Sequence, residues 1–254
     1  MSKNILVTGS SGLIGGIILK HNSKNNLFGL DIVPCSYPSH EISDISNSKK
    51  LENIFLENNI EVVVHLAGKT SVSGTWDNLI GNNFDGTANV FEASKNSGVK
   101  KVIFASSNHA VGLFENDDPY KQIVSGDYKD VKDYDLIKSN CEVRPDSLYG
   151  VSKAFGENIG RYYHETFGIK VACLRIGSVR PVDTPIEGDS HRFFSTWCSH
   201  KDISGLIEAC INSENIGFNI FYGVSDNKWK IWDISDQQKI LDFHPQSNAE
   251  IFRT

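Results

Sequence analysis

Short apolar runs alternate along the chain with stretches whose apolar residues recur at helical spacing. Residues 4–8 and 61–66 are nearly unbroken apolar runs, typical of parallel strands buried on both faces. The pattern predicts strands over 4–8, 27–31, 61–66, 101–105, 171–176 and 218–222, and helices over 13–19, 48–57, 78–97, 149–167 and 201–211. This alternation predicts an α/β fold with a Rossmann-type, doubly wound parallel sheet.

The periodicity weakens in two places. Residues 114–146 are acidic and tyrosine-rich, which predicts a long surface loop or flap with little core. Residues 177–192 form a proline-containing loop, and a tryptophan-containing tail closes the chain. We expect one domain over 1–254, with a dinucleotide-binding core at about 1–176 and a small substrate-binding lobe at about 177–254.

A glycine motif joins the first predicted strand to the first predicted helix. Gly9, Gly12 and Gly15 have the spacing of a dinucleotide-binding turn, and Asp31 ends the next strand about 20 residues later. A carboxylate there accepts hydrogen bonds from an adenosine ribose and repels the 2′-phosphate of NADP. Since no arginine follows closely, the sequence favours NAD. The alternative is that Asp31 only caps a turn.

Tyr149 and Lys153 are four residues apart on the predicted helix 149–167, which places them on one face one turn apart. A lysine ammonium beside a tyrosine favours the phenolate, so the phenol can act as a base. Ser106-Ser-Asn-His109 follows the strand 101–105, at the sheet edge where ligands bind in such folds. Either motif alone is weak, but their order and spacing predict a nicotinamide-dependent oxidoreductase.

Composition excludes several other classes. The net charge is −6 and no basic run occurs, which argues against nucleic acid and anionic membranes as partners. The five cysteines are odd in number and widely spaced, so we expect reduced thiols, no metal site and a cytoplasmic protein. The opening residues predict no signal peptide, and no apolar stretch approaches membrane-spanning length.

The motifs together resemble the extended short-chain dehydrogenases of the NAD-dependent epimerase/dehydratase superfamily. The resemblance rests on Thr8 to Gly15, His65 to Gly68, the serine pair after a strand, Tyr149 with Lys153, and Leu174 to Ser178. Within the superfamily, segments 106–109, 144–150, 175–178, 195–199 and 222–225 look specifically like uronate dehydrogenases. Such enzymes use NAD to oxidise C1 of galacturonate or glucuronate to a lactone.

The resemblance implies a role for each matching residue. Tyr149 is the implied base, Lys153 supports its phenolate form, and Ser107 and Asn108 hold the reacting oxygen. The implied sugar contacts are His109, Ser178 and Ser71, with Arg192 as a clamp for the substrate carboxylate. The implied cofactor residues are Gly9, Gly12, Leu13, Ile14, Gly15, Asp31, Asp44, Ile45, Leu66, Ala67, Gly68, Tyr149, Lys153 and Ile176. A homodimer through the helices around 80–97 and 150–167 is also implied.

Three departures from the family pattern leave alternatives open. Asn108 stands where a serine or threonine usually serves, so the hydroxyl role falls to Ser107 or is replaced by an amide. The loops before Tyr149 and before Arg192 are longer than in uronate dehydrogenases, so the pocket can differ. His109 and Arg192 can also be ordinary structural or surface residues. The competing functions are a neutral aldose or glucose 6-phosphate dehydrogenase, a nucleotide-sugar epimerase or dehydratase, and a non-catalytic NAD(H) sensor.

Overall fold

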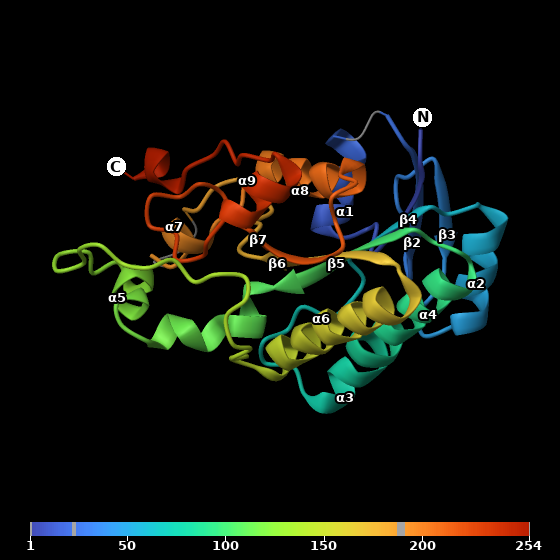
Figure 1. The fold of residues 1–254 in the computed structure, drawn as a ribbon, viewed down its shortest axis with the longest axis horizontal. Helices are drawn as coiled ribbons and strands as arrows, with labels where there is room; N and C mark the ends of the chain where they lie inside the picture. The colour runs from blue at the N-terminus through green and yellow to red at the C-terminus, as the bar shows by residue number, and fades with distance from the viewer. Residues whose placement is uncertain (1, 22–23, 187–190, 254) are drawn as a thin grey trace.

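The computed structural model describes residues 2–21, 24–186 and 191–253. In this part of the chain, parallel strands form one seven-stranded sheet in the order β3-β2-β1-β4-β5-β6-β7 (Figure 1). The strands are β1 (Asn4–Thr8), β2 (Asn26–Asp31), β3 (Ser39–Ile42), β4 (Val62–His65), β5 (Lys101–Ser107), β6 (Lys170–Ile176) and β7 (Phe218–Gly223). The strand order reverses between β1 and β4, and such a switch point opens a ligand crevice at the carboxyl ends of the strands.

Helices cover both faces of the sheet (Figure 1). One face packs against α1 (Leu13–His21) and α8 (His200–Asn212), and the other against α2 (Ser48–Glu57), α4 (Thr87–Asn96) and α6 (Leu148–Phe167). Each face has its own apolar core, because the side chains of each buried strand alternate between the two sides. The predicted doubly wound α/β fold is confirmed.

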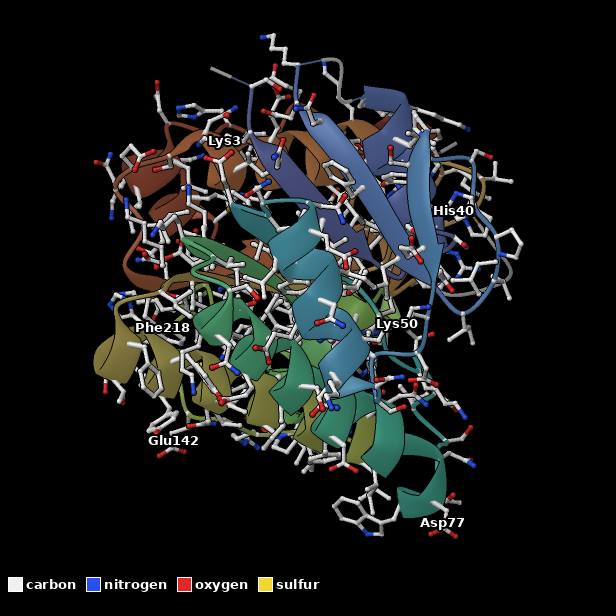
Figure 2. The ribbon with its side chains drawn as sticks, turned by 90° about the vertical axis from the view of Figure 1, so that its right-hand side faces the viewer. Lys3, His40, Lys50, Asp77, Glu142 and Phe218 are labelled. Carbon is white, nitrogen blue, oxygen red and sulfur yellow. The ribbon has the colours of Figure 1, made fainter. Side chains whose placement is uncertain are left out.

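The structure adds elements that the hydrophobic pattern does not predict. All four residues of β3 are exposed, so this edge strand has no apolar run; Figure 2 shows it with His40, beside α2 with Lys50. The predicted helix over 78–97 is instead α3 (Trp76–Leu79), a π-helical segment η1 (Ile80–Gly86) and α4. None of the described helices is both long and apolar enough to cross a bilayer.

The prediction of a surface loop with little core over 114–146 is wrong. This segment continues from the 3₁₀ segment η2 (Asn108–Asn116) through α5 (Tyr120–Ser125), and it buries Ile123 and Ile137. These side chains belong to a third apolar cluster, which also contains Tyr222 and Trp232. The sequence pattern misses this core because the contacting residues are irregularly spaced and lie about a hundred positions apart. We call residues 114–146 the insertion.

One part of the segment after β6 belongs to the sheet layer, and another part packs against the insertion. α8 and β7 complete the sheet layer, while α7 (Phe193–Thr196), α9 (Ser235–Leu241) and η3 (Ala249–Phe252) lie in the C-terminal part (Figure 1). Ile137 of the insertion forms a parallel bridge with Trp232. Residues 187–190 of the predicted loop 177–192 lie outside the described residues. The predicted boundary near 176 and the predicted homodimer stay predictions.

Glycines let α6 pack closely against the sheet. The helix begins after Ser147, whose side chain accepts a hydrogen bond from Gly150 N, and ends at Gly168 in the left-handed conformation. A Cβ at Gly156 would lie 2.1 Å from the Phe104 ring, which is buried in the core. This close approach sets the depth at which α6 presents its first turns to the end of β5.

We expect Gly156→Ala to lower the free energy of unfolding by about 1–3 kcal/mol, because the new methyl group overpacks the core against Phe104. Gly16→Ala in α1 is the matched control, since a Cβ there meets no atom within 4 Å. The control should be neutral or stabilising by up to about 1 kcal/mol, as alanine favours a helix over glycine. Urea unfolding of both variants measures the difference, and equal midpoints would contradict the packing argument.

Candidate active site

A cavity of about 850 Å³ lies at the carboxyl ends of β1, β2, β4, β5 and β6. Every residue predicted to hold the cofactor lines it: Gly9, Gly12, Leu13, Ile14, Gly15, Asp31, Asp44, Ile45, Leu66, Ala67, Gly68, Tyr149, Lys153 and Ile176. Ser107, Asn108, His109 and Ser178 line it as well. The fold therefore brings the N-terminal glycine motif and the central Tyr-Lys motif to one site.

In the turn between β1 and α1, the positions of Gly9 and Gly15 have no room for a side chain. Gly9 has φ +71°, and a Cβ on it would lie 2.7 Å from Ala67 N. A Cβ on Gly15 would lie 2.5 Å from Ser10 O. The turn therefore holds the start of α1 directly under the cavity, where backbone N–H groups and the helix dipole favour a pyrophosphate. These observations fit a bound dinucleotide.

Asp31 lies at the end of β2 on the wall of the same cavity. Its Oδ2 accepts a hydrogen bond from Ser11 N (2.9 Å) and its Oδ1 accepts one from Ile32 N (2.7 Å). The carboxylate thus caps the local turn, and since a carboxylate offers about four lone pairs it can also accept from ribose hydroxyls. The two interpretations of Asp31 are compatible.

We expect Asp31→Asn to raise the ratio of kcat/KM for NADP to that for NAD about tenfold or more, because the repulsion of the 2′-phosphate is removed. Asparagine keeps an oxygen that can accept from Ser11 N or Ile32 N. Steady-state kinetics with both cofactors measure the ratio. Asp44→Asn serves as the control, because Asp44 lines the cavity elsewhere, and an equal shift in both variants would contradict the assignment.

Tyr149 and Ser107 lie next to each other on the cavity wall. Burial raises the pKa of Tyr149 to about 12, the hydrogen bond with Ser107 lowers it, and the charge of Asp146 raises it. Ser107 ends β5, and its Oγ also accepts from His109 N (3.3 Å). Of the two candidates for the hydroxyl role, the structure places Ser107 against the phenol. The Tyr149 proton stays on the phenol near neutral pH unless positive charge is brought close.

Lys153 lies one turn further along α6 and is buried. Its Nζ donates to Ala105 O (2.8 Å) and lies 5.5 Å from the centre of the Tyr149 ring. Burial lowers the pKa of Lys153 to about 8, so the side chain is still an ammonium at neutral pH. The only positive side chain in contact with the Tyr149 ring among the described residues is therefore this buried lysine.

His109 faces Tyr149 and is oriented by Asp146. The two rings lie edge to face with centres 5.8 Å apart, and His109 Nδ1 lies 2.7 Å from Asp146 Oδ2. Burial raises the pKa of Asp146, but the hydrogen bond and charge of His109 outweigh this and lower it. Since Asp146 accepts at Nδ1, Nε2 of His109 is the nitrogen available to a sugar hydroxyl.

Arg192 is held by the protein itself. Its Nε donates to Glu115 Oε2 (2.5 Å) and its Nη2 to Glu115 Oε1 (2.7 Å). With its amide oriented so that its nitrogen donates to Ile176 O (3.1 Å), Asn108 accepts from Arg192 Nη2 (2.6 Å). Arg192 therefore lies behind Asn108, which lines the cavity, and Arg192 itself is not a lining residue.

The remaining predicted sugar contacts differ in position. Ser178 lines the cavity and its Oγ lies 2.9 Å from Thr196 Oγ1. Ser71 is exposed, pairs with Ser73 Oγ at 3.3 Å and does not line the cavity. The structure therefore brings Ser178 to the site and leaves Ser71 outside the described wall.

Three charged residues at this end of the cavity were not predicted from the sequence. Asp146 precedes Tyr149 by three positions, and this spacing could have drawn attention to it. Arg180 lines the cavity and lies over the Phe193 ring, while Glu115 carries no sequence signal because Arg192 is 77 positions away. Among the described residues, no group of His, Cys, Asp and Glu side chains has a metal-binding arrangement.

A switch-point cavity with a glycine turn, an acid at the end of β2 and a buried Tyr-Lys pair defines a Rossmann-fold oxidoreductase that uses NAD. The chain belongs to the NAD dependent epimerase/dehydratase family, whose model matches residues 5–199.

Comparisons with individual proteins agree with this family. The chain is 34% identical to the NAD-dependent glucose-6-phosphate dehydrogenase of Haloferax volcanii, over 99% of this chain and 96% of that protein. It is 30% identical to the uronate dehydrogenase of Pseudomonas syringae pv. tomato, over 98% and 84% of the two chains. A uronate dehydrogenase variant from Agrobacterium tumefaciens, solved in complex with NAD, superposes with a TM-score of 0.82 at 29% identity, covering 100% of this chain and 88% of that one.

Proposed function

We propose that this protein oxidises the C1 hydroxyl of a free sugar to the lactone with NAD, using Tyr149 as the base. The observation that carries the proposal is the Tyr149–Ser107 pair, which shares one cavity with the glycine turn and Asp31. The similarity to glucose-6-phosphate and uronate dehydrogenases supports a sugar as substrate.

The roles of the side chains follow from their positions. Ser107 holds the C1 oxygen beside Tyr149, which removes the hydroxyl proton as the C1 hydride departs and the C1=O bond forms. Bound NAD supplies the hydride acceptor and a positive ring. The Lys153 ammonium, with that ring, favours the phenolate that the buried site otherwise disfavours. His109, fixed by Asp146, positions the sugar ring through Nε2.

A free sugar is favoured over a nucleotide sugar. The segment after Ile176 builds α8 and β7 of the sheet layer. The insertion packs against the same C-terminal segment and occupies space on that side of the site.

Three substrate classes compete within this reaction. Similarity to uronate dehydrogenases favours galacturonate or glucuronate, with Arg192 as the carboxylate ligand. The ion pair between Arg192 and Glu115 favours an uncharged aldose, because the Arg192 guanidinium already binds the Glu115 carboxylate. Glucose 6-phosphate is the third candidate, and the cavity-lining Arg180 could bind its phosphate.

NADH formation by the purified protein tests the proposal. The panel is galactose, glucose, arabinose, galacturonate, glucuronate, glucose 6-phosphate and a UDP-sugar, each with NAD and with NADP. Turnover of one or more free sugars with NAD, with a lactone as product, is expected. Conversion of the UDP-sugar without net NADH would instead indicate an epimerase or dehydratase. NAD binding without any turnover would indicate a sensor.

A further inference from the structure

Glu115 and Arg192 form a closely fitted ion pair immediately behind the substrate end of the cavity. Both carboxylate oxygens of Glu115 accept from Arg192, and the side chains are only 12% and 25% exposed. A paired geometry of this kind is the one in which arginine also recognises carboxylate ligands. Glu115 therefore occupies the place at Arg192 that a substrate carboxylate would take.

The second edge of the guanidinium is also engaged. Nη2 donates to the Asn108 amide oxygen as well as to Glu115, so three of the five N–H donors of Arg192 point to protein atoms. Nη2 belongs to both edges of the guanidinium that can bind a carboxylate with two hydrogen bonds, the Nε–Nη2 edge and the Nη1–Nη2 edge. Each of these edges already has at least one donor bound to a protein atom. An incoming carboxylate cannot bind either edge with two hydrogen bonds unless Glu115 or Asn108 moves.

The carboxylates beside Arg192 also disfavour a substrate carboxylate at that position. Asp146 Oδ2 lies 2.7 Å from His109 Nδ1. Against the effect of burial, which raises the pKa of Asp146, the hydrogen bond and charge of His109 lower it, and the charge of Arg192 adds a smaller contribution in the same direction. Glu115 and Asp146 therefore both lie in the field of Arg192, and Arg180 is a second arginine at this end of the cavity. A uronate would add a third carboxylate to a partly buried site in which like charges repel strongly.

We propose that Glu115 is a specificity-determining residue that selects an uncharged sugar over its uronate by holding Arg192 in an internal ion pair. This inference rests on the proposed C1 oxidation. Arg192 then acts by positioning Asn108, which lines the cavity next to Ser107. The far end of the sugar carries hydrogen or hydroxymethyl.

The first test uses the unaltered enzyme and changes only the charge of the substrate. Galacturonate and its methyl ester have nearly the same shape, but the ester is neutral. We expect kcat/KM for the ester and for galactose to exceed that for galacturonate at least tenfold, about 1.4 kcal/mol. A kcat/KM for galacturonate equal to or above that of the ester overturns the inference. Failure to oxidise any free sugar overturns the proposed function itself.

The second test uses Glu115→Gln, which keeps the shape of the side chain and removes its charge. The ratio of kcat/KM for galacturonate to that for galactose should rise at least tenfold. Asp117→Asn is the matched control, because Asp117 lies two positions away and pairs with Arg144 away from the cavity wall. It should leave the ratio unchanged. An unchanged ratio in Glu115→Gln, or the same rise in both variants, overturns the role of Glu115.

Discussion

Replacing Tyr149 with phenylalanine is expected to lower kcat about a thousandfold or more while NAD still binds. The phenol is the only group that the proposed mechanism uses to take the hydroxyl proton, and positioned acid–base groups contribute about 10²–10⁴ in rate. Phenylalanine preserves the ring that lies edge to face with His109 and within 5.5 Å of Lys153 Nζ. Initial-rate measurements with the preferred sugar give kcat, and titration of intrinsic fluorescence gives the affinity for NAD.

Tyr162→Phe is the matched control for this change. Tyr162 lies on the same helix, α6, but its side chain is on the exposed face. Its kcat should stay within about twofold of the unaltered enzyme, since surface changes away from a site are small. If Tyr149→Phe retained a tenth or more of kcat, another group would have to be the base, and the proposed chemistry would be wrong.

The largest effect on stability is expected from Arg175→Met. Arg175 on β6 is 1% exposed and Glu157 on α6 is 3% exposed, and the two form two 2.9 Å hydrogen bonds. Ser106 Oγ donates to the same carboxylate, and Arg175 Nη1 donates to Ser139 O in the insertion. Removing the arginine leaves a buried carboxylate without its counter-charge, so the free energy of unfolding should fall by about 3–5 kcal/mol.

A pair of further variants distinguishes loss of charge balance from general damage. Combining Arg175→Met with Glu157→Leu should recover a large part of the lost stability, because no unpaired charge remains buried. Arg161→Met removes an arginine from an exposed i,i+4 pair with Glu165 on α6 and should cost less than about 1 kcal/mol. Urea unfolding followed by circular dichroism measures all three. A double variant as unstable as the single one would contradict the ion-pair argument.

The same network explains how the insertion is placed. Arg175 lies in the sheet, yet it also contacts the Tyr222 hydroxyl (3.2 Å) and the backbone of Ser139. The insertion is therefore tied to β6 by the partly buried hydrogen bond from Arg175 to Ser139 O, and to the C-terminal segment by the apolar cluster around Trp232. Its first residues supply Glu115, so the element that looks least structured in the sequence carries the residue proposed to set specificity.

The cofactor half of the site was predictable because each of its signals is local. Continuous apolar runs identify buried parallel strands, and the glycine spacing with Asp31 at the next strand end identifies a dinucleotide turn. The four-residue spacing of Tyr149 and Lys153 places both side chains on one face of a helix. In each case the residues that interact are close in sequence or lie at ends of adjacent strands, so a pattern records the geometry.

The substrate half depended on the tertiary structure. The sequence by itself determined the parallel sheet, the NAD turn and the Tyr149 site, since backbone periodicity and short spacings fix them. Only the fold decided that Ser107 reaches the phenol and that Glu115 neutralises Arg192. Glu115 and Arg192 are separated by 77 positions in the sequence. Their electrostatic interaction depends on the distance between them in space, and the residues around each of them in the sequence do not indicate that distance.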